Sequence, residues 1–338
     1  MRYHNVCIEA VGYALPPHVV TSRDLEEAIR PTLQRLGFPP GQIEQLSGVK
    51  ERRFWDPGTR PSEVAAIAGQ RALERAGIPA DRVQCLVNTS VCRDHLEPAT
   101  AALVAGRMGL ARQVICFDIA NACLGFLNGM MAAANMIELG QIDVALVVDG
   151  ESCREPVTHT LGRLARPDAT VQMLRDNFAT LTLGSGAVAA VLVRRDLSRS
   201  GHVLHGAVVR SSPEHHTLCY GDHTGMTTDS QGLLVHGAAL AAETWPLALD
   251  ELGWTADQVD EFVCHQVSVA HFRHSFETVG LPFEKAMLTF PYLGNVGPAS
   301  IPLTLALGEA NGRITRGTDL CLFGVGSGLG CIVMGVSW

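Results

Sequence analysis

Cys123 lies where a nucleophile is often found, between a predicted strand and a predicted helix. Residues 114–119, VICFDI, are expected to form a buried strand, Asn121 and Ala122 a turn, and Cys123 to begin a helix that ends at Gly140. A thiol at a helix N-terminus faces the positive end of the helix dipole and free amide groups, which favour the thiolate and can stabilise a nearby oxyanion. Cysteine is also among the most buried residue types, so position alone leaves a packing role open.

Three further residues have types and positions suited to acyl chemistry. His265 ends a short apolar strand and Asn295 lies in a Gly/Pro-rich turn, so both side chains are expected to project into clefts. Glu97 stands directly before Pro98 at the predicted start of a helix. A carboxylate can remove a proton from the carbon next to a thioester, but an acid in this position is also a common helix cap. A lone histidine or a turn asparagine likewise often has only a structural role.

An internal repeat predicts the elements that position these residues. Residues 72–91, ALERAGIPADRVQCLVNTSV, align without gaps with residues 248–267, ALDELGWTADQVDEFVCHQV. Each copy is typical of a helix closed by a glycine, Gly77 or Gly253, followed by a loop and an apolar strand. A second repeated pattern follows in each half: Gly184-Ser185-Gly186 and Gly326-Ser327-Gly328 each precede an apolar strand.

The repeat predicts an α/β protein built from two halves. We expect an N-terminal half over residues 1–197 and a C-terminal half over 198–338, separated by a polar turn. The first half carries extra chain, and the polar segment at about 151–180 is its expected location, as a cap or dimer insertion. Duplicated halves make a five-layered αβαβα sandwich plausible, although composition alone equally allows two doubly wound domains.

The composition narrows the partners and the compartment. The 338 residues are 47% hydrophobic and 18% charged, which suits α/β layers enclosed on both faces. A formal net charge of -8 without a basic, aromatic-rich run argues against a nucleic-acid surface. Irregularly spaced cysteines and the lack of a signal-peptide pattern indicate a cytoplasmic protein with reduced thiols. The uncharged stretches 119–137 and 320–338 contain asparagines or glycines, so we expect buried elements there and no membrane span.

Two weaker patterns do not predict a metal or a dinucleotide. The histidines between His202 and His223, with Cys219, lack the two close ligand pairs of a zinc site and are expected to form a surface loop. The glycines of residues 324–330 have the wrong spacing for a dinucleotide fingerprint and precede a strand.

The segment DIANACLGFLNGM around Cys123 resembles the active-site segment of ketoacyl-acyl carrier protein synthase III and its relatives in the thiolase superfamily. Two more motifs follow in the order of that family: residues 264–268, CHQVS, resemble its histidine motif, and residues 294–300, GNVGPAS, its asparagine motif. With residues 48–53, GVKERR, and residues 324–328, GVGSG, the resemblance spans almost the whole chain.

The resemblance implies a thiolase fold and a role for each residue. Cys123 carries the acyl group, while His265 and Asn295 donate hydrogen bonds to an enolate or thioester oxygen, and His265 also helps to activate the thiol. The backbone N–H groups of Cys123 and Val325 form a second oxyanion hole. No cofactor is implied, because coenzyme A thioesters are substrates.

Residues 88–101, NTSVCRDHLEPATA, resemble the OleA enzymes of bacterial long-chain hydrocarbon synthesis. Glu97 matches a glutamate that enters the active site of the neighbouring subunit in that family, which implies a homodimer acting on acyl-CoA or acyl-carrier-protein thioesters. Residues 52–56 and 148–151 resemble OleA as well. Gln42 stands where the standard synthase has a tryptophan that packs on adenine, so the resemblance does not define how this chain binds coenzyme A.

The resulting hypothesis is a non-decarboxylative Claisen condensation. Cys123 takes an acyl group from one acyl-CoA, Glu97 of the partner subunit deprotonates a second, and the product is a 2-alkyl-3-ketoacyl thioester. The first alternative is a decarboxylative synthase III reaction with a malonyl thioester, which needs no strong base. An ester- or amide-forming acyltransferase, or a non-catalytic acyl-binding subunit, are further alternatives.

Overall fold

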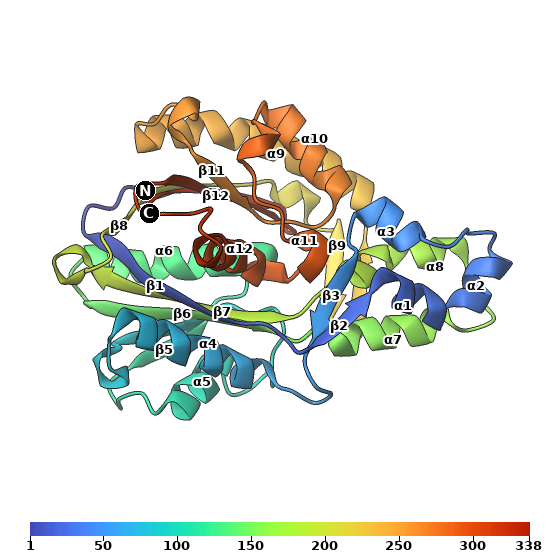
Figure 1. Ribbon diagram of the computed structural model, residues 1–338, viewed down its shortest axis with the longest axis horizontal. Coiled ribbons are helices and arrows are strands. Elements are labelled where there is room, and N and C mark those ends of the chain that lie inside the picture. Colours follow the sequence, from blue (N-terminus) through green and yellow to red (C-terminus); the bar gives the residue numbers. More distant parts are fainter.

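Nine strands form one sheet that runs through the protein, in a computed structural model that describes residues 1–338. The first five, in spatial order, are β5 (Ile115–Asp118), β4 (Cys85–Asn88), β6 (Val144–Glu151), β7 (Gly186–Arg194) and β1 (Val6–Ala14). The remaining four are β8 (His202–Ser211), β13 (Gly330–Ser337), β12 (Asp319–Gly326) and β11 (Glu261–Cys264). Only two residue pairs join β1 to β8, Cys7 with Val203 and Ile8 with His202. The sheet therefore divides at this junction into two parts that face each other (Figure 1).

Helices cover both faces of each part of the sheet (Figure 1). The outer face of the β5–β1 part packs against α4 (Pro61–Ala76) and α5 (Thr100–Met108). The outer face of the β8–β11 part packs against α9 (Ser230–Leu252), with α10 (Val269–Val279) beside it. Between the two parts lie α6 (Gly125–Glu138) and α12 (Ser300–Ala310). Strands enclosed on both sides have continuous apolar sequences, which explains the high hydrophobic content.

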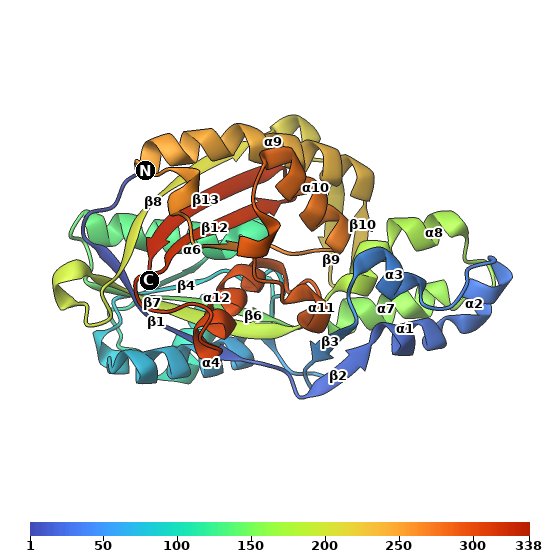
Figure 2. The same ribbon diagram turned by 45° about the horizontal axis from the view of Figure 1, so that its top comes forward.

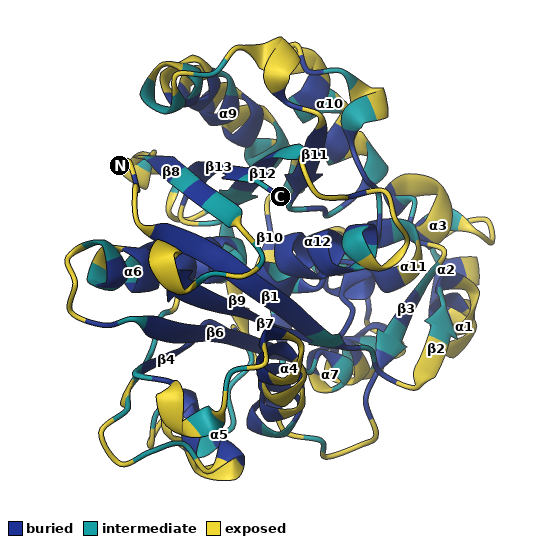
Figure 3. Cartoon of the chain, turned by 60° about the vertical axis from the view of Figure 1, so that its left-hand side comes forward, coloured by how far each residue is buried: buried dark blue, intermediate teal, exposed yellow.

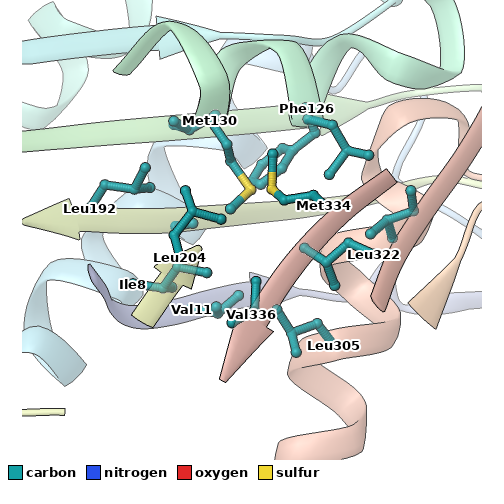
Figure 4. Close-up of a cluster of buried hydrophobic side chains, with 14 of the residues drawn as sticks. Ile8, Val11, Phe126, Met130, Leu192, Leu204, Leu305, Leu322, Met334 and Val336 are labelled. Carbon is teal, nitrogen blue, oxygen red and sulfur yellow. The ribbon is translucent and has the colours of Figure 1, made fainter. Parts of the chain in front are cut away.

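The main hydrophobic core fills the space around α6 and α12. Figure 4 shows Phe126 and Met130 of α6 directed toward side chains of the surrounding strands, among them Met334 and Leu322. Small residues allow α6 to lie close to the sheet. A Cβ atom on Gly129 would lie 2.5 Å from Cγ2 of Thr89, so a larger residue would push the helix away from β4 and β6.

A smaller lobe lies beside the sheets (Figure 2). It contains the segment predicted as a cap, here α7 (Arg154–Leu164) and α8 (Val171–Asp176) between β6 and β7. The N-terminal part of the chain contributes β2 (His18–Thr21), α1 (Ser22–Ala28), α2 (Arg30–Arg35), α3 (Gln42–Ser47) and β3 (Glu51–Phe54). The hairpin of β9 (Cys219–Asp222) and β10 (Gly225–Thr228) and the short α11 (Phe290–Leu293) lie at the edge of this lobe. One hydrophobic cluster joins α1 and α2 to α7 and α8.

The predicted repeat has the same local structure in both copies. α4 ends at Gly77 with φ 60° and α9 ends at Gly253 with φ 68°, both left-handed caps, and each is followed by a 3-10 turn and then β4 or β11. Residues 320–338 form the buried pair β12 and β13, as expected. No helix is both long enough and apolar enough to cross a membrane.

The prediction of a buried strand before Cys123 was wrong in one respect. β5 is the outermost strand of the sheet, and Ile115 is 47% exposed. The central strands β1, β6 and β7 are instead almost wholly buried (Figure 3). A half-buried edge strand and a buried central strand have similarly apolar sequences when they are this short, so the pattern cannot separate them.

Candidate active site

A cavity brings together four of the five predicted site residues. Cys123, His265, Asn295 and Val325 all line it, and about 1050 Å³ of empty space lies inside it and its open mouth. From Cys123 the lining continues between the β11–β13 strands and the helices α9 and α10, where Leu233, Ala241, Phe272, Phe276 and Val279 make it mainly apolar. Its size and lining are typical of a site for a ligand with a long apolar part.

Cys123 lies in a strained connection between β5 and α6. A 3-10 turn at Ala122–Leu124 precedes α6, so the cysteine lies just before the helix instead of beginning it. Ala122 has φ 45°, a left-handed conformation that costs about 1–2 kcal/mol for a residue with a Cβ atom. Gly125 lets the turn approach β4, because a Cβ atom there would lie 2.6 Å from the carbonyl oxygen of Thr89. The backbone thus places the thiol at the cavity wall.

The protonation of Cys123 differs from the expectation at a helix N-terminus. Burial raises the pKa of its thiol to about 12, and the neighbouring Cys219 and Glu151 act in the same direction. Hydrogen bonds from the backbone N–H groups of Cys123 and Ser327 oppose this rise but do not cancel it. The backbone N–H groups of the turn thus act in the direction expected from the sequence, but loss of solvation outweighs them, so the resting thiol is protonated. The resting thiol needs a base.

His265 lines the same cavity as the thiol. It follows β11, and its backbone N–H donates to the carbonyl oxygen of Phe323 at 2.9 Å. Both ring nitrogens are buried and have no hydrogen-bond partner in the chain. Burial, with a contribution from His271, lowers the pKa of His265 to about 4. The ring is therefore neutral near pH 7, with one nitrogen to accept a proton and one N–H to donate.

The side chain of Asn295 is oriented by its own turn. Its backbone N–H donates to Thr182 O, its carbonyl oxygen accepts from Gly184 N–H, and both distances are 2.9 Å. Oδ1 of the side chain accepts from the N–H of Gly297 at 3.0 Å, which leaves Nδ2 to donate to a substrate oxygen. The arrangement fits the hydrogen-bonding role expected for this residue.

The turn after β12 completes the surroundings of the thiol. Val325 lies in β12 at the cavity wall, and its neighbour Gly326 approaches the cysteine closely. A Cβ atom on Gly326 would lie 3.4 Å from Cβ of Cys123. Sequence reasoning missed Ser327, although the Gly-Ser-Gly pattern around it was a visible signal of a tight turn.

Glu97 does not line the cavity. It lies in the connection from β4 to α5, residues 89–99, and is exposed on the surface of the chain without a hydrogen bond. The helix-cap alternative is not supported, because Asp118 at the end of β5 occupies that position. Its two carboxylate oxygens accept from the backbone N–H groups of Thr100 and Ala101 at 2.9 and 2.8 Å. Glu97 is left free to interact with something outside this chain.

Two buried contacts hold the 89–99 connection in place. Glu151, at the end of β6, accepts from the backbone N–H groups of Val91 at 2.6 Å and Cys92 at 3.1 Å. Arg93 forms an ion pair with Asp118, which also caps α5. The connection is thus anchored at its first residues, while its outer part, with Leu96 and Glu97, extends into solvent.

Sequence reasoning also missed two polar residues of the cavity. His271 of α10 and Cys219 of β9 both line it, so Cys219 is not part of a simple surface loop. Nδ1 of His271 lies 3.0 Å from Oγ of Ser268, which caps α10. Helical periodicity places residue 271 on the inner face of α10, so the sequence did contain a signal for His271. The spacing of residues around Cys219 contained no such signal.

No group of three possible metal ligands lies in the cavity. Among the His, Cys, Asp and Glu side chains, one such set exists, Cys92, Glu151 and Cys153, and Cys92 belongs to the 89–99 connection.

Gln42, which stands where the standard synthase has the tryptophan that packs on adenine, is the first residue of α3. Its Nε2 donates to Oε1 of Gln45 at 2.9 Å.

Comparisons with known families agree with this geometry. Residues 56–194 match the family described as Thiolase, N-terminal domain, and residues 249–338 match the 3-Oxoacyl-[acyl-carrier-protein (ACP)] synthase III C terminal family. The chain is 40% identical over 338 residues to the acyl-CoA:acyl-CoA alkyltransferase of Xanthomonas campestris pv. campestris, and 39% identical over 350 residues to that of Shewanella oneidensis. Both alignments cover 100% of the chain and 100% of the relative. The β-ketoacyl-[acyl-carrier-protein] synthase III of Rhizobium meliloti is 29% identical, over 95% of each chain.

Solved structures give the same result. A crystal structure of Xanthomonas campestris OleA with bound cerulenin matches with a TM-score of 0.98 at 40% identity, over 100% of this chain and 98% of that one. Another crystal structure of that protein contains lauric acid and lauroyl-CoA, and it matches with a TM-score of 0.97 at 40% identity, over 99% of this chain and 100% of that one.

Proposed function

We infer the reaction from one premise: the chain belongs to the thiolase superfamily and, within it, to the acyl-CoA:acyl-CoA alkyltransferases of the OleA type. It joins two fatty acyl-CoA molecules by non-decarboxylative Claisen condensation. The observation that carries this assignment is the full-length identity of 40% to such an enzyme. The convergence of Cys123, His265 and Asn295 in one apolar cavity supports it.

In the first half-reaction, Cys123 becomes acylated. Neutral His265 accepts the thiol proton, and the thiolate attacks the carbonyl carbon of one acyl-CoA. The backbone N–H groups of Cys123 and Val325 stabilise the oxyanion, and coenzyme A leaves as a thiol with the proton from His265. Burial keeps the His265 ring neutral near pH 7, so one of its nitrogens is free to accept the proton. The acyl chain then occupies the cavity beneath α9 and α10.

In the second half-reaction, Glu97 of the partner subunit removes the α proton of a second acyl-CoA. Nδ2 of Asn295 and the N–H of His265 donate to the resulting enolate oxygen. The α carbon attacks the thioester on Cys123, so a carbon–carbon bond forms while the carbon–sulfur bond breaks. The released Cys123 thiolate takes up the proton that Glu97 removed from the α carbon, so both groups return to their starting states, and the product is a 2-alkyl-3-ketoacyl thioester of coenzyme A.

A homodimer is part of the proposal. Glu97 is exposed and does not reach the cavity of its own chain, whereas a second copy can bring it there. Leu96 beside it is 103% exposed, and β5 leaves one edge of the sheet unpaired. Exposed apolar residues and unpaired strand edges are usually covered in the functional assembly. We expect the same interface to cover these features.

The domain organisation belongs to the same proposal. We assign residues 1–197 and 198–338 to two pseudo-symmetric halves of a five-layered αβαβα sandwich, with 151–180 as the cap or dimer insertion. The repeated α4–β4 and α9–β11 units, and the place of α6 and α12 between the two parts of the sheet, support this division. We also propose a cytoplasmic location, which the ten free cysteines support.

Mass spectrometry separates the proposed reaction from its alternatives. The wild-type protein is incubated with acyl-CoA alone and then with malonyl-CoA added, and the thioester on Cys123 and the released β-keto product are measured. Condensation with acyl-CoA alone is expected. Condensation only after addition of malonyl-CoA would instead identify a decarboxylative synthase, and no acylation at all would identify a non-catalytic subunit.

A further inference from the structure

Cys92, Glu151 and Cys153 form a buried cluster that the reaction does not use. The two sulfur atoms and a carboxylate oxygen all lie within 4.8 Å of one another. Cys92 lies at the start of the 89–99 connection, Glu151 ends β6, and Cys153 directly precedes α7. Three elements that are distant in the sequence thus converge on one point, which sequence spacing does not reveal.

We propose that this cluster binds a thiophilic divalent cation of the zinc class. Two thiolates and one carboxylate are ligands that Zn²⁺ accepts in tetrahedral sites, with a fourth position for water. Hard cations such as Mg²⁺ and Ca²⁺ require oxygen ligands and do not suit two sulfur atoms. Glu151 is 1% exposed and Cys153 is 6% exposed, so the ligands are sheltered from competing solvent.

Hydrogen bonds from neighbouring groups already position two of the three proposed ligand residues. Glu151 accepts from two backbone N–H groups, those of Val91 and Cys92, which fix its carboxylate in position. The backbone N–H of Cys153 donates to Oγ of Ser185 at 2.8 Å, which fixes the start of α7. Cys92 Sγ–H donates only to the carbonyl oxygen of Ser152, at 3.6 Å. Binding releases the thiol protons to solvent, so affinity rises with pH.

Charge favours a cation at this position. The Glu151 carboxylate lies beside two thiol sulfur atoms, so a divalent cation would contact all three groups at once and stabilise them in their anionic forms.

The bound cation would tie the 89–99 connection to β6 and α7. That connection carries Glu97, so the ion would hold the base in position for the partner subunit. This consequence rests on the proposed role of Glu97, but the cation site itself does not. Zinc is therefore expected to raise the thermal midpoint of unfolding even in a protein that cannot condense acyl-CoA.

The test uses Zn²⁺ and the full-length chain with Cys123→Ala and Cys219→Ala, which removes two of the three thiols that line the cavity. Elemental analysis after dialysis should find one zinc ion per chain. Adding Cys92→Ser or Cys153→Ser should weaken binding by at least about 100-fold, more than loss of an outer-shell partner costs. Cys116→Ser, at a half-buried thiol outside the cluster, serves as the matched control and should leave binding unchanged.

A measurement on the wild-type chain avoids any folding defect of these variants. Cd²⁺ should protect Cys92 and Cys153 from N-ethylmaleimide, with the modified residues located by mass spectrometry. Equal alkylation with and without Cd²⁺, or zinc binding that survives both serine substitutions, would overturn the proposal. A Cys92–Cys153 disulfide in a reduced-then-aerated sample that binds no zinc would overturn it as well, in favour of a redox pair.

Discussion

Cys123 and Glu97 follow two neighbouring parallel strands, β5 and β4, yet their side chains meet opposite surroundings. Cys123 lies at a cavity wall with His265 and Asn295, and the backbone of its own chain positions each of the three. Glu97 is exposed, makes no hydrogen bond within the chain and does not line this cavity, while the first residues of its connection are anchored by Glu151. In the proposed mechanism, one chain therefore contains the whole acylation site but presents its deprotonating group to another molecule.

The largest expected effect concerns Cys123 and the acylation site. Cys123→Ala should abolish both acylation and condensation, lowering the rate by about 10,000-fold or more, because no other group can carry the acyl chain. Mass spectrometry of the intact protein after addition of acyl-CoA measures the adduct. In Cys219→Ala, a change to the second thiol of the same cavity, the acyl group should remain on Cys123. An adduct on Cys219 in the Cys123→Ala protein would contradict the assignment.

The next largest effect separates the two sides. Glu97→Ala should lower condensation by about 100- to 10,000-fold, the usual contribution of a general base, while acylation of Cys123 keeps its wild-type rate. Quenched-flow acylation and product release are measured on the same preparation. Glu155→Ala, which removes an exposed acid on α7, is the control and should change neither rate. Unchanged condensation in the Glu97→Ala protein would leave that residue without a catalytic role.

Dependence on pH should distinguish a buried base from an exposed one. Because burial lowers the pKa of His265 to about 4, acylation should stay level between pH 8 and pH 6 and decline only toward pH 4. The unfolded chain takes up this proton near pH 6.5 and the folded chain does not, so stability should fall as the pH falls from 6.5 toward 4. Stopped-flow acylation and urea unfolding across this range measure both. A break in the acylation rate near pH 6.5 would mean that His265 is solvated.

The smallest expected effect concerns Asp118 at the end of β5, which holds the 89–99 connection through Arg93 and caps α5. Asp118→Asn weakens the cap of α5 and the ion pair with Arg93, and should lower the free energy of unfolding by about 0.5–2 kcal/mol. Condensation should fall more than acylation, because the loosened segment carries Glu97 and not Cys123. Urea unfolding and the two rates of the variant test this. An equal fall in both rates would show that Asp118 supports the cavity instead.

The sequence predicts the repeated units well because their signals are local. Gly77 and Gly253 occupy left-handed caps, which glycine fills with little strain, and the apolar runs after them are too short and too buried to form anything but strands. The motif order likewise leads to the correct family, since Cys123, His265 and Asn295 each follow a strand or turn signal. These features depend on neighbours within a few residues.

Other properties depend on contacts between segments that are distant in the sequence, and local sequence patterns do not predict them. Burial raises the pKa of Cys123, and the turn after β12 that lies close to it is more than 200 residues away in the chain. The edge position of β5 and the capping of α5 by Asp118 follow from the order of strands in the sheet. The apolar sequence of β5 alone predicts neither of them. The cluster of Cys92, Glu151 and Cys153 appears only when β6 and the 89–99 connection are placed side by side.

A hybrid dimer tests the central claim, that Cys123 and Glu97 of one active site come from different chains. Chains with Cys123→Ala and chains with Glu97→Ala, each inactive in condensation alone, are co-expressed with different tags, and the hybrid fraction is purified by both tags. One of its two sites then has Cys123 from one chain and Glu97 from the other, so the hybrid should recover about half of the wild-type condensation rate. No recovery above the two parent proteins would contradict the claim and place Glu97 in the same chain as its cysteine.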